Sequence, residues 1–312
     1  MDRMTENKIV LITRRTRLDD LISRFNTVSQ AKFYVEHLGA DFSDYLTEHQ
    51  QYYKTKAEAE SVLRVIGRLQ TVDRSFLPNF IFGKEDTVVV LGQDGLIANT
   101  VKYSSAQPII GVNPDPNRWD GKLLPFVVSD LTKIVPEVFL HKRQVKKVTM
   151  AKAQLNNGQV LYAVNDFFVG IKSHTSARYV IRVGSKQEQQ SSSGIIVSTG
   201  LGSTGWFKSL MVGAVAITSK VSGQKLSVQI QESFPWDADY LYFTVREPFP
   251  SKMTSTSLVF GRITESEPLA LVSQMPEAGV IFSDGVESDF LEFNSGSHAT
   301  ITLAESKGHL VV

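Results

Sequence analysis

DTVVVLGQDG, residues 86–95, joins a continuous apolar run to a glycine turn, and it decides the predicted fold class. An uninterrupted run rich in β-branched residues is typical of a parallel strand that is buried on both faces. Similar runs occur at 7–14 and 108–112. Helical patterns lie between these strands, at 18–25, 29–39 (with Ser29 as N-cap) and 56–70 (opened by a capping-box pattern at 55–58). The alternation predicts a parallel α/β sheet with a ligand site near the carboxyl ends of its strands.

The second half of the chain has a different pattern. Strand patterns at 144–155 and 159–170 flank Asn156-Asn157-Gly158, which predicts a hairpin closed by an Asn-Gly turn. One helical pattern follows, at about 204–219, and the polar segment 187–193 (QEQQSSS) predicts an exposed loop. Further strand patterns lie at 178–183, 194–199, 225–230, 240–245, 256–263, 268–272, 279–283 and 299–304.

The chain has 312 residues, a length that suggests about two domains. We predict an α/β plus β architecture: a Rossmann-like parallel α/β domain at 1–140, followed by a β-rich sandwich domain at 141–312. The 33 Lys and Arg residues nearly balance the 32 Asp and Glu residues, which argues against nucleic-acid and anionic-membrane partners. With 0 Cys, the chain has no disulfides, thiolate nucleophiles or cysteinyl metal sites.

Targeting, membrane and metal signals are not found in the sequence. The longest uncharged apolar stretch, 209–219, is well short of the roughly 20 residues that a membrane-spanning helix needs. We therefore expect a cytoplasmic protein. The six histidines have no metal-ligand spacing, so no metal site is predicted, and no Walker A sequence is present.

Two glycine-rich turns could carry chemistry. Asp94 lies between Gly92 and Gly95, just after a buried strand; glycines admit phosphate oxygens, and the carboxylate could take a proton from a hydroxyl group. A plain Asp-Gly turn is the alternative there. Residues 199–205 (TGLGSTG) join a strand to a helix and favour an anion site. They spell G-x-G-x-x-G, but the acidic residue expected about 20 positions later is missing, which argues against a dinucleotide fingerprint.

Two polar clusters are weaker candidates. Asn165-Asp166 could hold the two hydroxyl groups of a ribose, although the pair taken alone favours a turn. Arg14, Arg15 and Arg17 follow the first strand and could meet phosphates, with a solvated face as the alternative.

Taken in order, these motifs resemble the NAD kinase family, including its polyphosphate-dependent members. The family's Gly-Gly-Asp-Gly-Thr is similar to residues 92–96 (GQDGL), its Asn-Glu pair to Asn165-Asp166, and its Thr-Pro-Thr-Gly-Ser-Thr-Ala-Tyr to 199–206 (TGLGSTGW). PIIGVNPDP at 108–116, the segment near Arg17 and Ser192-Ser193-Gly194 resemble the mitochondrial-type branch and its bacterial relatives.

This resemblance implies a nucleotide-binding α/β domain, a β-rich domain, and a site in the cleft between them. The implied activity is transfer of a phosphoryl group from ATP with Mg²⁺, or from polyphosphate, to the 2′-hydroxyl group of the adenosine ribose of NAD. It also implies a homo-oligomer. Asp94 is the implied catalytic residue. The implied nucleotide-binding residues are Gly92, Gly95, Asn165, Asp166, Ser193, Thr199, Gly202, Ser203, Thr204 and Arg17.

Four positions depart from the family pattern. Gln93 replaces a glycine and Leu96 a threonine, Asp166 is one methylene shorter than glutamate, and Gly205-Trp206 replaces Ala-Tyr. Two alternatives therefore stay open beside an NAD kinase. One is a catalytically silent relative that binds NAD(P) or another nucleotide as a sensor or partner. The other is a kinase of the same architecture that acts on a lipid or sugar hydroxyl group.

Overall fold

The structure is a computed structural model that describes residues 3–224 and 234–312. It divides into two compact units: unit 1, residues 1–146 with 309–312, and unit 2, residues 147–308. The chain thus passes between the units twice, at 146/147 and at 308/309. Each unit has its own core, and the last strand, β16 (His298–Val311), pairs with strands of both units.

Unit 1 is built on a parallel sheet, as predicted. The order of its strands is β2-β1-β3-β4, and the last residues of β16 pair in parallel with β4. The strands are β1 (Lys8–Thr13), β2 (Arg68–Asp73), β3 (Thr87–Leu91), β4 (Pro108–Val112) and β16 (His298–Val311). All five residues of β3 are buried, which confirms the prediction of a strand covered on both faces.

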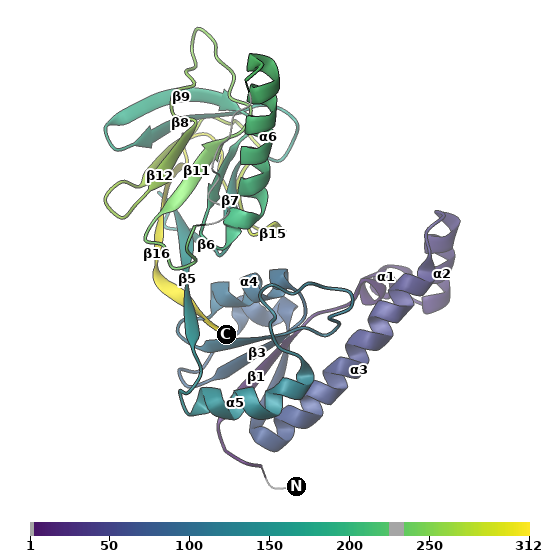
Figure 1. Ribbon diagram of the computed structural model, residues 1–312. Helices are drawn as coiled ribbons and strands as arrows, with labels where there is room; N and C mark the ends of the chain where they lie inside the picture. The colour runs from purple at the N-terminus through teal and green to yellow at the C-terminus, as the bar shows by residue number, and fades with distance from the viewer. Residues whose placement is uncertain (1–2, 225–233) are drawn as a thin grey trace. The chain divides into compact units, whose positions relative to one another are not determined.

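Helices cover both faces of this sheet. They are α1 (Arg17–Phe25), α2 (Val28–His37), α3 (Phe42–Ile66), α4 (Asp94–Tyr103) and α5 (Leu131–Phe139), with 3₁₀ turns at Arg74–Asn79 and Val128–Asp130. Figure 1 shows α4 and α5 on opposite faces. The core on the α5 face joins apolar residues of α3 and α5 to alternate residues of β1, β3 and β4, because successive strand side chains point to opposite faces.

The strand order produces a switch point at the carboxyl ends of β1 and β3. After β1 the chain passes through three helices to β2 on one side, and β3 then pairs with the other side of β1. In open α/β sheets, ligands bind outside the carboxyl ends of the strands at such a point. The loops at that position are 14–16, after β1, and 92–93, after β3.

The helix predicted at 56–70 is wrong at both ends. In the structure α3 begins at Phe42, with Asp41 as N-cap, and β2 begins at Arg68. Thr55 lies inside the helix, and its hydroxyl group donates to the carbonyl oxygen of Gln51 at 2.9 Å, so the capping-box pattern there is not a helix start. No glycine or proline interrupts residues 42–66, which allows one long helix. The second helix also begins earlier than predicted, with Thr27 rather than Ser29 as N-cap.

Unit 2 is a β-sandwich, which confirms the β-rich prediction. One sheet has the order β12-β11-β10-β7-β14-β15 and is antiparallel throughout; the other contains β16-β13-β8-β9 with β5 and β6. Inward-facing residues of both sheets form its core. Its strands are β5 (Val145–Leu155), β6 (Val160–Ala163), β7 (Asp166–Ile171), β8 (Ala177–Val183), β9 (Lys186–Ser192), β10 (Ile195–Ser198), β11 (Leu241–Val245), β12 (Phe260–Ile263), β13 (Leu269–Ser273), β14 (Gly279–Ser283) and β15 (Val286–Glu292).

Two predictions for this half need correction. The strand pattern at 159–170 is two strands in different sheets: β6 pairs with β5 in the predicted hairpin, whereas β7 lies between β10 and β14. The segment 187–193 is not a loop. Most of it is β9, which pairs with β8 and buries the side chains of Gln190 and Ser192.

The helix predicted at 204–219 is α6 (Trp206–Ser222), preceded by a 3₁₀ turn at Gly202–Thr204. The strand predicted at 225–230 lies outside the described residues. Among the helices that the structure describes, none is both long enough and apolar enough to cross a membrane.

The polar pairing inside β9 leads to a stability prediction. The buried hydroxyl group of Tyr179 on β8 donates to Gln190 Oε1 at 3.0 Å and lies 2.7 Å from Ser192 Oγ. Tyr179→Phe leaves two buried polar groups without this partner, so we expect a loss of about 1–3 kcal/mol in the free energy of unfolding, measured by urea denaturation. Tyr162→Phe is the matched control; its exposed contact with Glu305, at 3.5 Å, predicts a loss under about 0.5 kcal/mol. Equal losses in the two variants would contradict the buried pairing.

Candidate functional site

Asp94 is the first residue of α4, immediately after the turn that follows β3. Its carboxylate accepts hydrogen bonds from two successive backbone N–H groups, those of Lys122 at 3.2 Å and Leu123 at 2.9 Å. The side chain is therefore held in one orientation, at the switch-point edge of the unit 1 sheet.

The two glycines beside Asp94 differ in what surrounds them. A Cβ atom on Gly92 would lie 2.7 Å from Leu96 Cδ2 and 3.7 Å from Arg14 Cδ, so this glycine is packed between the first turn of α4 and the loop after β1. A Cβ atom on Gly95 would meet no atom within 4 Å. Packing does not require glycine at 95, and the backbone there faces open space that a ligand could enter.

The arginines after β1 are paired with carboxylates inside unit 1. Arg14 Nη2 lies 2.9 Å from Glu48 Oε1, Arg17 Nε lies 2.5 Å from Glu48 Oε2, and Arg17 Nη2 lies 2.7 Å from Asp44. Although burial opposes its ionisation, hydrogen bonds from Arg14 and Arg17 hold the pKa of Glu48 below its usual range. Arg17 thus lies at the start of α1 with its charge matched by α3, while Arg15 is exposed.

The 199–205 turn in unit 2 is tightly packed. Thr199 Oγ1 donates to the carbonyl oxygen of Val164 at 2.5 Å, and Ser203 Oγ donates to that of Gly200 at 2.7 Å. A Cβ atom on Gly202 would lie 2.0 Å from the carbonyl oxygen of Asn165. The buried hydroxyl groups and the glycine therefore hold this turn against the segment that contains Asn165. Thr204, at the end of the turn, is exposed.

A single carboxylate organises the break between β6 and β7. Asp284 accepts hydrogen bonds from the backbone N–H groups of Val164 (3.0 Å), Asn165 (2.7 Å) and Asp166 (3.3 Å). Asp284 itself has a left-handed φ of 54° and lies in the Asp-Gly turn between β14 and β15. The chain can therefore leave one sheet at Ala163 and enter the other at Asp166 with its amides satisfied.

Beside this break is a pocket of about 280 Å³. Three aromatic rings line it, those of Phe168, Trp206 and Phe282. Three charged side chains line it as well, those of Asp166, Lys172 and Arg246. The rings of Phe168 and Trp206 are stacked, with centroids 5.8 Å apart. The Arg246 guanidinium lies over Trp206, 5.4 Å from its centroid. Among the described residues, the buried Arg246 Nε has no hydrogen-bond partner.

The carboxyl group of Asp166 has an unusual environment within this pocket. Burial, together with the nearby charge of Asp284, raises its pKa to about 7. The group is consequently close to half protonated at neutral pH, and it can both donate and accept a hydrogen bond. Such a perturbed acid in a pocket is a functional-site candidate.

Several predicted site residues come together in unit 2. Thr199, Gly202 and Asn165 are in contact through the bonds and the close approach described above, and Asp166 follows directly. Ser203 is buried in the same turn. Ser193 is exposed, and its backbone N–H donates to the carbonyl oxygen of the pocket residue Arg246 at 2.9 Å.

Sequence reasoning missed the rest of the pocket. Asp284 could have been found from its Asp-Gly turn signal between two strand patterns. Phe168 and Phe282 come from strand patterns in which no local signal separates a ligand-facing ring from a core ring, and Lys172 follows the first of these strands. Only the pairing of β7 with β14 brings them together.

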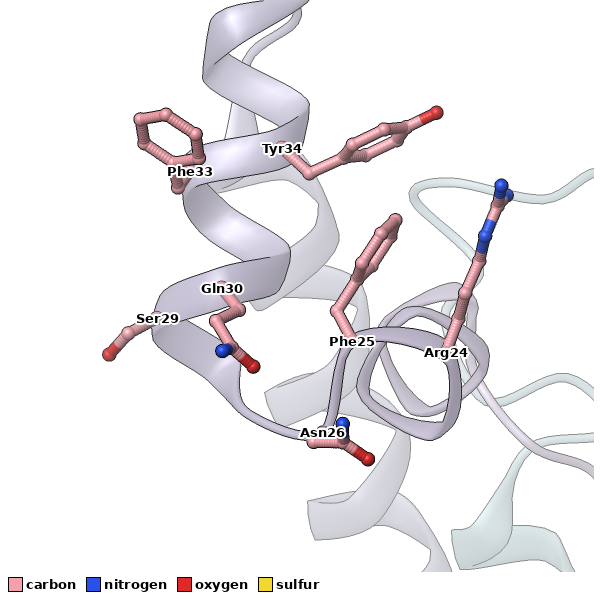
Figure 2. A pocket seen from close by; sticks show the side chains of 7 residues that line it. All are labelled: Arg24, Phe25, Asn26, Ser29, Gln30, Phe33 and Tyr34. Carbon is pink, nitrogen blue, oxygen red and sulfur yellow. The ribbon is translucent and has the colours of Figure 1, made fainter.

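A larger pocket, of about 540 Å³, lies between α1 and α2. Figure 2 shows the rings of Phe25 and Tyr34 facing each other there, beside Arg24, whereas Phe33 points away. None of the predicted site residues lines it. In the part of the chain that the structure describes, no group of three or more His, Asp and Glu side chains is arranged to hold a metal ion.

The surroundings of the glycines lead to a paired stability prediction. Gly202→Ala forces a Cβ atom against a backbone oxygen, so we expect a loss of about 2 kcal/mol or more in the free energy of unfolding. Gly95→Ala places its methyl group in open space on a helix, so we expect no loss and a gain of up to about 1 kcal/mol. Urea denaturation of both variants measures the difference; a destabilised Gly95→Ala would show that the space at 95 is not open.

The raised pKa of Asp166 makes stability depend on pH. The pKa of about 7 in the folded protein exceeds the ordinary value of 3.8, so protonation favours folding. The free energy of unfolding then falls as pH rises from about 4 to 7, and this contribution is constant above that range. Asp166→Asn removes the titration, so relative to wild type it should gain on the order of 3 kcal/mol between pH 4 and 8.

Urea denaturation at pH 4, 5, 6, 7 and 8 measures this gain, with the exposed Asp239→Asn as control. A wild-type-minus-variant difference that is flat across this pH range would exclude a raised pKa at Asp166.

Comparison with known proteins supports a common origin with one group of enzymes. No protein-family model matches the chain. The chain is 23% identical to the rat (Rattus norvegicus) protein named "NAD kinase 2, mitochondrial", over 95% of this chain and 85% of that protein. It is 24% identical to the rice (Oryza sativa subsp. japonica) "Probable NADH kinase", over 64% of this chain and 63% of that protein.

Solved structures show the same fold. A yeast NADH kinase crystallised with NADH superimposes with a TM-score of 0.59 at 16% identity, covering 99% of this chain and 84% of that one. An NAD kinase from Archaeoglobus fulgidus in complex with ATP gives 0.54 at 13% identity, covering 98% and 93%. With the parallel sheet of unit 1 and the antiparallel sheet of unit 2, the chain has the NAD kinase fold, and its sequence is similar to those of the NAD and NADH kinases named above.

Proposed function

We propose that this protein transfers the γ-phosphoryl group of ATP to the 2′-hydroxyl group of the adenosine ribose of NAD(H), forming NADP(H). The observation that carries the proposal is the unit 2 pocket, in which aromatic rings, two cations and the half-protonated Asp166 line one cavity. Two relatives bear the names of NAD and NADH kinases, and solved relatives hold NADH and ATP, which supports a nucleotide as the ligand.

Each part of a nucleotide finds suitable chemistry in that pocket. The aromatic wall formed by Phe168, Trp206 and Phe282 offers apolar surface against which a planar base can pack. The unpartnered Nε of Arg246 and the ammonium group of Lys172 can bind phosphate oxygens. Asn165 and Asp166 bind ribose hydroxyl groups, and Ser193, Thr199, Gly202, Ser203 and Thr204 support or line the nucleotide site.

In unit 1, Asp94 is the proposed general base. It takes the proton of the 2′-hydroxyl group as that oxygen attacks the γ-phosphorus; the bond from phosphorus to the bridging oxygen breaks, and ADP leaves with its electron pair. Gly92 and Gly95 admit phosphate oxygens, and Arg17 lies after the neighbouring loop with its guanidinium paired to Glu48 and Asp44. Mg²⁺ enters as MgATP, held by the substrate's own phosphates. Inorganic polyphosphate is the alternative donor, and a cytoplasmic homo-oligomer belongs to the same proposal.

The kinase proposal predicts a large effect at Asp94. Purified protein with NAD⁺ or NADH, ATP and Mg²⁺ should form NADP(H), and Asp94→Asn should lower kcat by at least ~10²-fold, as loss of a general base does. Because an asparagine oxygen can still accept from Leu123, the dissociation constant for NAD(H) should stay within about threefold. Coupled NADP(H) detection measures kcat, and calorimetry measures binding. Gly95→Ala, which leaves the fold intact, should weaken ATP binding.

A silent nucleotide-binding relative is the competing function. The observation that favours it is the engagement of both Asp94 oxygens by backbone amides, together with Gln93 and Leu96 in the same turn. It predicts a thermal shift with NAD(H) but no NADP(H) from ATP or polyphosphate. In that case Gln93→Gly with Leu96→Thr should raise turnover. Turnover in wild type that survives Asp94→Asn undiminished would refute the proposed base.

A further inference from the structure

A second charged cavity lies at the opposite ends of the strands of the unit 1 sheet. It has a volume of about 320 Å³ and is lined by residues of unit 1 alone. Pro108, the first residue of β4, pairs with His309 of β16 at this edge, and Val138 adds the last turn of α5. Because parallel strands share one direction, this edge holds their amino ends, away from the turn that contains Asp94.

The polar wall of this cavity is basic. His141, Arg143 and His309 line it. Two of these residues belong to HKRQVKK, residues 141–147, in which five of seven residues are basic and none is acidic. The carboxylate facing Arg143 is Glu137, whose oxygen lies 3.6 Å from Arg143 Nε, beyond hydrogen-bond distance. Positive charge is therefore concentrated at this cavity in a chain whose total charge is near zero.

The guanidinium of Arg143 is held in place, but its Nε has no hydrogen-bond partner among the described residues. Its guanidinium lies over the ring of Phe126, 5.3 Å from the centroid, and this contact restricts its orientation. The unpaired Nε is also buried. A buried donor without an acceptor costs free energy, which an oxyanion bound in the cavity would recover.

The rest of the wall is apolar. Ala106, Pro108, Val138 and Val145 supply carbon surface without hydrogen-bonding side chains. At ~30 Å³ for each water-sized group, the cavity has room for a ligand of roughly ten such groups. Inorganic phosphate would leave this apolar surface uncovered, whereas a phosphate ester of a small apolar group fits both the charge and the walls.

We propose that this cavity binds a small phosphate monoester with an apolar body, separately from the nucleotide function proposed above. The phosphate group meets Arg143 and the two imidazoles, and the apolar body lies against Val138 and Val145. The chain crosses between the units at 146/147 and 308/309, so Val145 and His309 lie next to the two crossings. A ligand here would contact both connections, a position suited to regulation.

Isothermal titration of the full chain with phenyl phosphate tests the proposal, with saturating NADH present to occupy the proposed nucleotide site. We expect a dissociation constant on the order of 1 mM or tighter. Inorganic phosphate and phenol should each bind at least tenfold more weakly, because the first lacks the apolar body and the second lacks the phosphate group. Benzoate reports whether a carboxylate can replace the phosphate group.

Variants that change the charge or the shape of the cavity test where the ligand binds. Arg143→Gln should weaken phenyl phosphate at least tenfold, and Ala106→Leu, which fills the cavity, should do the same without removing charge. Lys142→Gln is the matched control, since it removes one charge from the same segment at a residue outside the cavity wall. Equal losses for Lys142→Gln and Arg143→Gln, unchanged binding in Ala106→Leu, or no wild-type binding at 10 mM would each overturn the proposal.

A thermal-shift measurement with NADH separates this test from the test of the proposed function. Arg143→Gln should leave the shift unchanged, so loss of phenyl phosphate binding with an intact NADH shift supports a separate site. If wild type does not bind NADH at all, the nucleotide proposal fails, and the phenyl phosphate titration still decides the cavity.

Discussion

The Asp284 carboxylate is the interaction on which the unit 2 site depends. Three successive backbone amides, from Val164 to Asp166, donate to it at the point where the chain leaves one sheet of the sandwich for the other. Without that acceptor, the partly buried amides would need other hydrogen-bond partners. Each amide left without one would lower the free energy of unfolding by about 1–3 kcal/mol. Burial raises the pKa of Asp166, and the charge of Asp284 adds to this effect. One residue therefore holds the break between the strands and also favours the protonated form of the acid beside it.

Much of the fold could be predicted because buried strands and helices have characteristic patterns of apolar residues in the local sequence. Residues 88–91 are apolar at every position, as a strand covered on both faces requires, and this run predicts β3. Residues 159–170 show the limit. Residues 160–164 and 167–169 are apolar and only Asn165 and Asp166 separate them, so the sequence resembles one strand with a polar pair inside it. The acceptor that makes the change of sheet possible lies 119 residues away from Asn165. The polar segment 187–193 became a strand for a similar reason, since its Gln and Ser side chains find buried partners on β8.

Long-range packing changes the interpretation of several motif residues. Gly202 looks like a phosphate-binding glycine in sequence, yet the backbone of Asn165 already excludes a side chain at that position. Gly95 looks like half of an ordinary Asp-Gly turn, yet nothing in its surroundings excludes a side chain. Arg14 and Arg17 resemble phosphate ligands, but Glu48 and Asp44 pair with them. The use of each residue is decided by long-range packing, which a single sequence does not display.

The hydrogen bonds at Asp94 do not by themselves rule out a role as a base. A carboxylate offers about four lone-pair positions, and the amides of Lys122 and Leu123 use two of them. The remaining positions can still accept a hydroxyl proton. An anchored carboxylate also loses little conformational entropy when a substrate arrives, which is what a positioned base requires.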